Sequence, residues 1–380
     1  MLEKKKDVRK TFISLVAVAL FLALVLVLDQ VIKPSNKMYM LLTVLQKGSV
    51  YALAAVSMNL LNGFTGLFSL GHAGFMVIGA YTYAIFSIPA ASRDTVYQYY
   101  DAAVRISFPE VLGNAMGGFG TVLGVIICVI LAGLMASLFA YLIGLPVLRL
   151  KSDYLAIATL GFAEIIRAIV QWDSLGPVTN GSNLLKTYPT FNSVMPKDMS
   201  VLFPFIVAGV CIALILLLIN STYGRAFKAI RDDEIAAEAM GVNLFHHKQM
   251  AFVISSFFAG VGGALLAMYQ GSLQANAFKS SMTYEILLIV VIGGLGSISG
   301  SVLANYLFIA CSEWWLRFLD NEQFIFGWKV PLLRSGFRMV VFSVIIMAIV
   351  LFFRKGIMGD RELDLVSMFT GKSRKERKTQ

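Results

Sequence analysis

The chain has 380 residues, of which 58% are hydrophobic and 14% are charged, and its mean hydropathy is +0.75. So few charged residues cannot cover the surface of a water-soluble globule of this length, so the composition excludes a soluble enzyme or regulatory domain. The net charge of +10 does not indicate nucleic-acid binding, because basic residues beside membrane helices face an anionic leaflet.

Apolar runs of the length that crosses a bilayer recur along the whole chain. A helix needs about 20 apolar residues to cross the hydrocarbon region. The sequence therefore predicts an all-α polytopic membrane protein with about ten transmembrane helices, at residues 12–32, 39–61, 66–88, 119–148, 154–171, 200–220, 250–270, 284–295, 298–316 and 336–353. The run 284–295 is too short to cross alone, so a re-entrant half-helix is an alternative there.

The distribution of positive charge predicts the orientation of the chain. Cytoplasmic loops collect Lys and Arg, and 19 of the 32 lie in four places: the N-terminus, the link before Asp153, the segment 221–249 and the tail. We expect a basic cytoplasmic N-terminus (1–11), a transmembrane domain (12–353) and a basic cytoplasmic tail (354–380). The first apolar run has no signal cleavage site, so we expect it to be retained.

Glycine interrupts the apolar pattern at two places, "NGFTGLFSLGHAG" (62–74) and "GGLGSISG" (293–300). Interrupted helices in matching places of two inverted repeats indicate a transport site, whereas ordinary tight turns are the alternative. Polar groups at membrane depth are costly unless they line a cavity or find partners. The candidate substrate-pathway residues of the two breaks are Asn62, Thr65, Ser69, His72, Ser297 and Ser299.

Three candidate residues have two interpretations each. His72, just after the first break, either donates to a substrate or ties a bent backbone carbonyl. Glu164 and Arg167 lie one turn apart within the run 154–171, where they either form an intrahelical ion pair or line the substrate path.

The sequence offers no signal for catalysis or metal binding. It contains no HExxH, CxxC or Ser-His-Asp set, and "GKS" (371–373) lacks the first Gly of a phosphate-binding loop. We therefore expect no catalytic residue, no metal site and no ATPase activity in this chain.

A charged segment, "GRAFKAIRDDEIAAEAMG" (224–241), lies between two apolar runs. It is rich in Ala, contains no Pro and ends in Gly, which predicts one or two short helices. Phe227 and Ile230 fall on one face, and Lys228 and Asp232 can pair four residues apart on the other. A helix of this kind outside the bilayer fits a groove in another protein, and a solvated connector is the alternative.

Five blocks resemble the membrane permease subunits of bacterial ABC importers, in particular those of the high-affinity branched-chain amino acid type. They cover about half of the chain and lie in the family's order. They are "GLFSLGHAGFMVIGAYTYA" (66–84), "LKSDYLAIATLGFAEIIRAIV" (150–170), "TNGSN" (179–183), "TYGRAFKAIRDDEIAAEAMGVNLFHHKQMAFVISSFFAGVGGALLA" (222–267) and "MTYEILLIVVIGGLGSISGSVL" (282–303).

The resemblance implies that the charged segment is the EAA loop, with the motif Glu-Ala-Ala, three variable residues and Gly. The sequence departs from the motif at Ile235, which stands where the Glu would be. The loop would act as a coupling helix that inserts into a cytoplasmic ATPase subunit. The candidate coupling residues are Arg225, Lys228, Arg231, Asp232, Asp233, Glu234, Ala236, Ala237, Glu238 and Gly241.

The resemblance also implies the activity and the partners. The chain would be a permease subunit of the bacterial inner membrane that translocates branched-chain or other aliphatic amino acids and binds no cofactor of its own. Its partners would be two ATPase subunits that use ATP, a second permease subunit forming a heterodimer, an extracytoplasmic substrate-binding protein and membrane lipid.

The cargo and the transport class have alternatives. Related importers for urea, short amides or other small solutes share these motifs, and an ion-coupled secondary carrier would also have broken helices. If the cargo is an amino acid, its carboxylate would suit free backbone N–H groups near residues 69–71 or 297–300.

Overall fold

The structure, a computed structural model, is helical almost throughout the residues it describes. These are residues 20–30, 39–150, 152–195, 200–316, 324–325, 328–329, 340–344, 347, 351, 356–359 and 362. Within this part of the chain the strands are β1 (Phe324–Ile325) and β2 (Trp328–Lys329), which pair antiparallel. The described residues thus agree with the predicted all-α class. The predicted N-terminus 1–11 and most of the tail 354–380 lie outside them.

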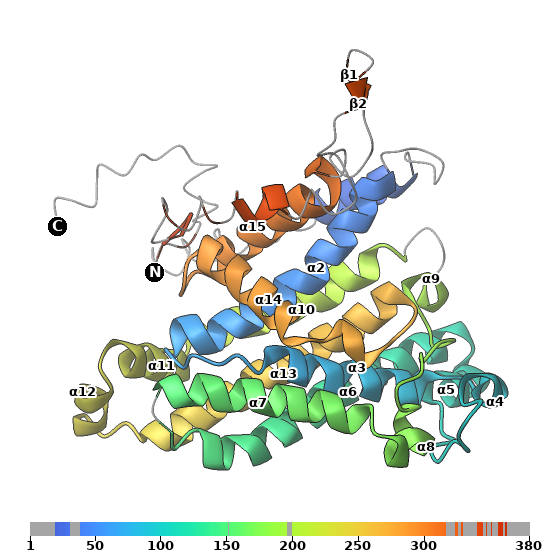
Figure 1. The fold of residues 1–380 in the computed structure, drawn as a ribbon, viewed down its shortest axis with the longest axis horizontal. Helices are drawn as coiled ribbons and strands as arrows, with labels where there is room; N and C mark the ends of the chain where they lie inside the picture. Colours follow the sequence, from blue (N-terminus) through green and yellow to red (C-terminus); the bar gives the residue numbers. More distant parts are fainter. Residues whose placement is uncertain are drawn as a thin grey trace, which may run out of the picture.

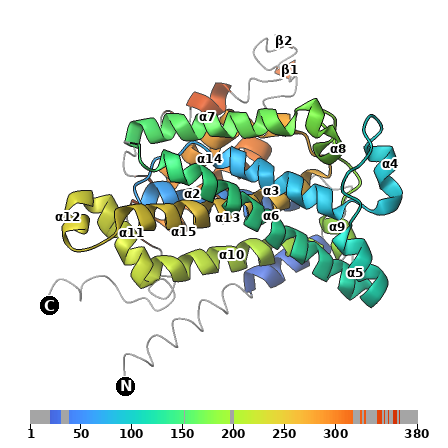
Figure 2. The same ribbon diagram turned by 90° about the horizontal axis from the view of Figure 1, so that it is seen from below.

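Long helices form a bundle with short helices at its two ends (Figure 1). The long helices are Leu20–Gln30, α2 (Tyr39–Asn59), α3 (His72–Ser87), α6 (Gly118–Val147), α7 (Ser152–Val170), α10 (Leu202–Asn220), α13 (Leu244–Gln270), α14 (Ser280–Gly293) and α15 (Ile298–Ile309). The short helices are α4 (Arg93–Val96), α5 (Phe108–Met116), α8 (Gly176–Thr179), α9 (Phe191–Val194), α11 (Thr222–Asp232) and α12 (Glu234–Ala239). α11 and α12 lie at the end opposite to α4, α5 and α8 (Figure 2).

Single turns of 3-10 or π helix extend or connect these helices. The 3-10 turns are η2 (Ala90–Ser92), η3 (Asp173–Leu175) and η4 (Ala275–Ala277), and the π turns are η1 (Leu60–Phe64) and η5 (Ala310–Trp314). Each π turn continues a long helix, η1 that of α2 and η5 that of α15. π turns are rare and frequently lie at functional sites.

Several of these helices suit a membrane. Five segments of the described residues are long and apolar enough to cross one: Met40–Phe64, Gly118–Val147, Leu202–Asn220, Leu244–Gln270 and Ala275–Gly293. The number rises to seven if two bent pairs, His72–Ser87 with Ala90–Val96 and Tyr154–Val170 with Asp173–Thr179, are each one span. The chain is therefore a multi-pass membrane protein, and ten crossings stay a prediction because the run 336–353 lies largely outside the described residues.

The short predicted run 284–295 is part of a longer helical segment. α14 starts at Ser280 and follows η4, so the apolar segment Ala275–Gly293 has 19 residues, enough to cross a membrane. The prediction placed the start too late because Ser280 and Thr283, which precede residue 284, lower the hydropathy there. A re-entrant half-helix is not needed to explain the length of this segment.

Glycines let α13 approach α3 closely at the centre of the bundle. A Cβ added to Gly263 would lie 2.0 Å from the Met76 carbonyl oxygen, and one added to Gly79 would lie 2.1 Å from the Gly260 carbonyl oxygen. Small residues at such contacts maximise van der Waals packing between membrane helices. This packing fixes α3, and with it the first glycine break.

Candidate functional site

The first glycine break is an extended segment between α2 and α3. After η1, α3 begins only at His72, so the first residues of the predicted run 66–88 are not helical. The Asn62 side chain holds the segment, because its Nδ2 donates to the Ser69 carbonyl oxygen at 3.3 Å and its Oδ1 accepts from the Ser69 N–H at 3.2 Å. Thr65 Oγ1 donates to the Leu60 carbonyl oxygen at 3.0 Å. The helix is thus broken at these residues, and a transport site at the break stays a prediction.

Side chains from two other helices bind the backbone of this break. The Leu70 N–H donates to Thr159 Oγ1 of α7 at 3.0 Å, and the Ala73 N–H donates to Thr283 Oγ1 of α14 at 3.1 Å. Buried backbone donors need partners, and here the hydroxyls of α7 and α14 supply them. The break thus has no free N–H at Ser69, Leu70 or Ala73 for a cargo carboxylate.

His72 holds the start of α3 against α2. Its Nε2 lies 2.8 Å from Ser57 Oγ, and Ser57 Oγ donates to the Ala54 carbonyl oxygen at 2.9 Å. The hydroxyl has one proton, so it accepts from His72 Nε2–H. Only 3% of His72 is exposed. His72 therefore binds a serine hydroxyl of α2 rather than a bent backbone carbonyl, and its role in transport stays a prediction.

The second glycine break lies between α14 and α15, and Asn59 of α2 binds it. Asn59 Nδ2 donates to the Ser297 carbonyl oxygen at 2.9 Å and to Ser301 Oγ at 2.8 Å, while Oδ1 accepts from the Gly296 N–H at 2.9 Å. Ser297 Oγ caps α15 by accepting from the Gly300 N–H at 3.0 Å. Gly296 has φ +90, a conformation that favours Gly.

A carboxylate of the chain itself occupies the start of α15. Glu362 Oε1 accepts from the Ile298 N–H at 2.7 Å, and its Oε2 accepts from the Ser299 N–H at 3.0 Å and from Ser299 Oγ at 2.6 Å. We expected these N–H groups to be free for a cargo carboxylate, and that expectation is wrong for this structure. No pattern in the sequence pairs Glu362 with the second break.

The two breaks pack against each other. A Cβ added to Gly63 would lie 2.5 Å from the Gly296 backbone nitrogen and 1.8 Å from Asn59 Oδ1. The first break, from the N-terminal half of the chain, therefore contacts the second break, from the C-terminal half. Two interrupted helices that form a common site would meet in this way.

The charged segment forms α11 and α12, as predicted. Asp233 separates the two helices, and its Oδ1 caps α12 by accepting from the Ile235 N–H at 2.9 Å and the Ala236 N–H at 3.0 Å. Phe227 and Ile230 are buried on α11. Ala237 is the buried residue of α12.

α11 touches the first break through two basic residues. Arg231 Nη1 donates to the Gly63 carbonyl oxygen at 3.1 Å, and Lys228 Nζ lies 5.6 Å from the centre of the Phe64 ring. Asp232 forms an ion pair with Arg231 at 3.1 Å. The predicted pair of Lys228 with Asp232 is therefore wrong, because each finds another partner.

α12 projects from the bundle with most of its side chains exposed. Ile235 is 81% exposed and Met240 is 85% exposed, and Arg225, Glu238 and Gly241 are also exposed. Gly241 has φ +87, and no atom lies within 4 Å of a Cβ added there. Glycine at this position thus serves the turn after α12 rather than packing.

An ion pair ties α12 to the next helix. Glu234 binds Lys248 of α13 at 2.7 Å. This contact, together with buried Ala237, fixes one side of α12 and leaves the other side exposed.

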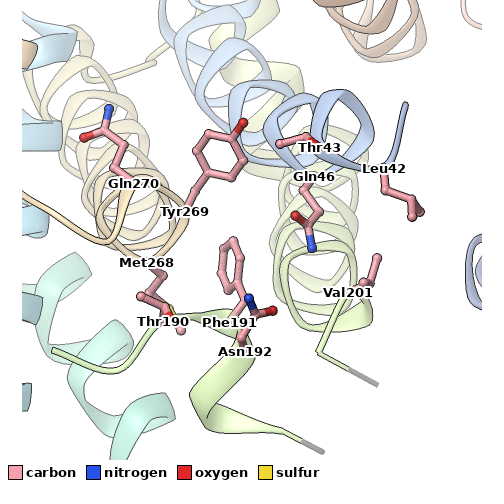
Figure 3. A pocket seen from close by; sticks show the side chains of 10 residues that line it. All are labelled: Leu42, Thr43, Gln46, Thr190, Phe191, Asn192, Val201, Met268, Tyr269 and Gln270. Carbon is pink, nitrogen blue, oxygen red and sulfur yellow. The ribbon is translucent and has the colours of Figure 1, made fainter. Parts of the chain in front are cut away.

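Sequence reasoning missed two cavities. One, of about 440 Å³, lies where α2, α9 and α13 meet, and Gln46, Phe191, Met268 and Tyr269 are among its lining residues (Figure 3). The other, the α11 cavity, has about 230 Å³ and is lined by Phe64, Leu216, Ile219, Asn220, Lys228, Arg231, Gly296, Ile298 and Glu362. In the part of the chain that the structure describes, no group of three or more His, Cys, Asp and Glu could hold a metal ion.

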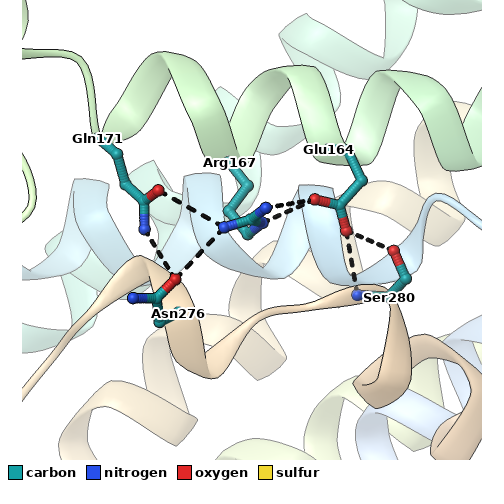
Figure 4. A network of polar contacts seen from close by, with 5 residues as sticks. All are labelled: Glu164, Arg167, Gln171, Asn276 and Ser280. Atoms are coloured by element: carbon teal, nitrogen blue, oxygen red, sulfur yellow. Dashed lines mark hydrogen bonds and ion pairs between the residues drawn. The ribbon is translucent and has the colours of Figure 1, made fainter.

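Glu164 and Arg167 form the predicted intrahelical ion pair on α7, at 2.6 Å (Figure 4). Glu164 Oε1 also accepts from the Ser280 N–H at 3.3 Å and from the Ser280 hydroxyl, at the start of α14. Arg167 Nη1 donates to Asn276 Oδ1 at 3.4 Å and to Gln171 Oε1 at 3.5 Å. The pair therefore belongs to a network between α7, η4 and α14, and no sequence pattern indicated the other members of this network.

Known proteins match most of this chain in sequence. The family model described as "Branched-chain amino acid transport system / permease component" matches residues 40–353. The high-affinity branched-chain amino acid transport system permease protein LivM of Escherichia coli (strain K12) is 32% identical over 306 residues, covering 73% of this chain and 64% of that relative. The chain thus spans less than two thirds of that relative.

Two further relatives match over most of their own lengths. The probable branched-chain amino acid transport permease protein LivM of Methanocaldococcus jannaschii is 23% identical over 326 residues, covering 83% of this chain and 92% of the relative. The permease protein LivH of Salmonella typhimurium is 24% identical over 326 residues, covering 84% and 94%. No solved structure matches the chain. Because the family model spans both glycine breaks, α11 and α12, the chain belongs to the family of branched-chain amino acid transport system permease components.

Proposed function

We propose that this chain is the permease subunit of an ABC importer that translocates branched-chain or other aliphatic amino acids. The observation that carries the proposal is the hydrogen bond from Arg231 to the Gly63 carbonyl oxygen, which joins a projecting surface helix to the first glycine break. The family match and the names of the LivM and LivH relatives support the cargo class. The chain would be a transport subunit, and partner subunits would hydrolyse ATP.

The exposed face of α12 supports a docking role for that helix. Ile235 and Met240 are large apolar side chains at the far end of the bundle, and they lie among charged residues of α11 and α12. Large apolar groups on an amphipathic helix favour insertion into a groove of a partner. We assign this groove to a cytoplasmic ATPase subunit, with Ile235 supplying an apolar contact in place of the Glu of the EAA motif.

Close packing would carry a movement of α11 to the first break. A Cβ added to Gly66 would lie 3.2 Å from Arg231 Cα, so the two backbones are in contact. Elements whose atoms are already in contact transmit displacement, because neither can move toward the other without pushing it. ATP binding would drive transport only if the ATPase contacts α11 and α12 differently in its two states.

We place the substrate path along the two breaks and the network of Glu164 and Arg167. The candidate groups are those predicted from the sequence, and the hydrogen bonds of Ser297, Ser299 and His72 support a role for these three residues in shaping the path. Glu164 and Arg167 are partly exposed, at 35% and 22% of their side chains, and offer charges of both signs to a zwitterion.

Partners and location complete the proposal. The relatives include both LivM and LivH permeases, which supports a heterodimer of two permease subunits. The helices α4, α5 and α8, opposite to α11 and α12, would meet the substrate-binding protein outside the cell (Figure 2). We infer a bacterial inner-membrane protein with ten crossings, inverted repeats and both termini in the cytoplasm.

Reconstitution tests this function. The chain is purified with its second permease and ATPase subunits, placed in liposomes, and supplied with binding protein and radiolabelled leucine. We expect uptake that requires ATP and the binding protein. Uptake of urea but not leucine would support the alternative cargo, and uptake by this chain alone under an ion gradient would contradict an ABC importer.

A further inference from the structure

The C-terminal part of the chain docks at the second glycine break. The Ile357 N–H donates to the Ile292 carbonyl oxygen at 2.8 Å, and the Met358 N–H donates to the Gly293 carbonyl oxygen at 3.2 Å. A Cβ added to Gly294 would lie 2.6 Å from the Gly359 carbonyl oxygen. These contacts satisfy the last carbonyl groups of α14, which have no partner within the helix.

Glu362 completes this docking at the start of α15. Its carboxylate accepts three hydrogen bonds, from the Ile298 N–H, the Ser299 N–H and Ser299 Oγ, at 2.7, 3.0 and 2.6 Å. The N-terminus of a helix carries positive partial charge, so a carboxylate is stabilised there. The residues at 356–359 therefore hold the end of α14, and Glu362 holds the beginning of α15.

The same residue also belongs to the α11 cavity. Glu362 lines this cavity together with Lys228 and Arg231 of α11. Lys228 has its ammonium over the Phe64 ring and forms no ion pair among the described residues. Charges of opposite sign thus line one cavity, and solvent screens their attraction because Glu362 and Arg231 are exposed.

A continuous series of contacts connects these elements. Arg231 donates to the carbonyl oxygen of Gly63, and Gly63 packs on Gly296. The N–H groups that bind Glu362 follow Gly296 by two and three residues. Contacts through the two breaks therefore connect α11 to the start of α15, and residues of both elements line the α11 cavity.

We propose that Glu362 is a positioning residue of the coupling mechanism, which holds the start of α15 so that movement of α11 reaches the second break. This role rests on the proposed function. Without the carboxylate, α15 would lose its attachment to the docked C-terminal residues, and ATP hydrolysis would continue with less transport.

The test uses the reconstituted complex with ATPase subunits, binding protein and radiolabelled leucine. The variant Glu362→Gln keeps the shape of the side chain, but its amide nitrogen cannot accept a hydrogen bond. Hydrogen bonds to a charged group are stronger than those to a neutral one. We therefore expect Glu362→Gln to transport about tenfold less leucine per ATP hydrolysed than the unmodified complex. Glu362→Asp, which keeps the charge, should recover part of this ratio, and Glu376→Gln, the same change later in the tail, should leave it unchanged.

Ser299→Ala provides a second measurement, because it removes one donor to Glu362. If the two residues act together, the double variant, Ser299→Ala with Glu362→Gln, lowers the leucine transported per ATP hydrolysed by a smaller factor than the product of the two single-variant factors. An unchanged ratio in Glu362→Gln overturns the proposal. Absence of Glu362→Gln from the membrane also overturns it, because Glu362 would then be needed for folding only.

The failure of this role differs from the failure of the proposed function. If the unmodified complex shows no leucine uptake driven by ATP, the proposed function fails. If the unmodified complex transports leucine and Glu362→Gln transports it with the same ratio, only the role of Glu362 is lost.

Discussion

The guanidinium of Arg231 donates a hydrogen bond to the carbonyl oxygen of Gly63 at 3.1 Å, and this bond joins α11 to the first glycine break. Arg231 also pairs with Asp232, which orients the guanidinium. A surface helix and an interrupted transmembrane segment thus share one contact. In our account, this contact transmits work from a partner to the transport path.

Replacing Arg231 tests this contact. Loss of a hydrogen bond to a charged group costs about 1.5 to 3 kcal/mol, so Arg231→Ala should lower ATP-driven leucine uptake at least about tenfold. Arg231→Lys keeps the charge but not the planar donor group, so we expect an intermediate rate. The control is Arg105→Ala, which removes an Arg from an exposed ion pair with Asp101 and should not change uptake. Equal uptake by all three variants would count against the contact.

Gly63 of the first glycine break and Gly241 after α12 should respond differently to replacement by Ala. Gly63→Ala would press on Asn59 and Gly296, so we expect a loss of stability of about 3 kcal/mol. Gly241→Ala meets no neighbouring atom and costs only backbone strain, about 1 to 2 kcal/mol. Thermal unfolding in detergent gives both values. A loss as large at Gly241 as at Gly63 would mean that the breaks are not tightly packed.

His72 distinguishes a role in holding α3 from contact with the cargo. His72→Gln can still donate to Ser57 Oγ, whereas His72→Leu cannot and should lose about 1 to 3 kcal/mol of stability. We expect uptake to follow stability, with Gln better than Leu in both measurements. If both variants stop uptake while the unfolding temperature is unchanged, His72 contacts the cargo.

Glu164 and Arg167 are the charged residues that we place on the substrate path. Glu164→Gln removes the ion pair with Arg167 and the charge facing Ser280, and we expect about tenfold slower leucine uptake. Asp101→Asn removes a carboxylate from an exposed ion pair, worth about 0 to 1 kcal/mol, and should leave uptake unchanged. Uptake that is normal in Glu164→Gln would assign this pair to the stability of α7 and α14 alone.

Local patterns in the sequence predicted the features that depend on neighbouring residues. The glycine breaks, the pair of short helices and the ion pair of Glu164 with Arg167 all depend on residues a few positions apart. Spacing along one helix or turn determines which of these residues can meet. These features could therefore be predicted from the sequence without knowledge of the fold.

Contacts between distant segments could not be predicted in this way. Asn59 reaches Gly296, and Glu362 reaches Ser299, because helix packing brings them together. Tertiary contact also displaced a local pair, since Lys228 lies over Phe64 rather than beside Asp232. The sequence shows which polar side chains need a hydrogen-bond partner. Which partner each one finds depends on how the helices pack.

The most direct test of the account asks what α12 touches. A photoactivatable amino acid is placed at Ile235, which is 81% exposed, and the intact complex is irradiated in membranes with and without ATP. Our account predicts a covalent adduct with an ATPase subunit whose yield changes with ATP, and no such adduct from the same label at Tyr99, at the opposite end of the bundle. An ATPase that is present in the complex but never labelled from Ile235 would contradict the account.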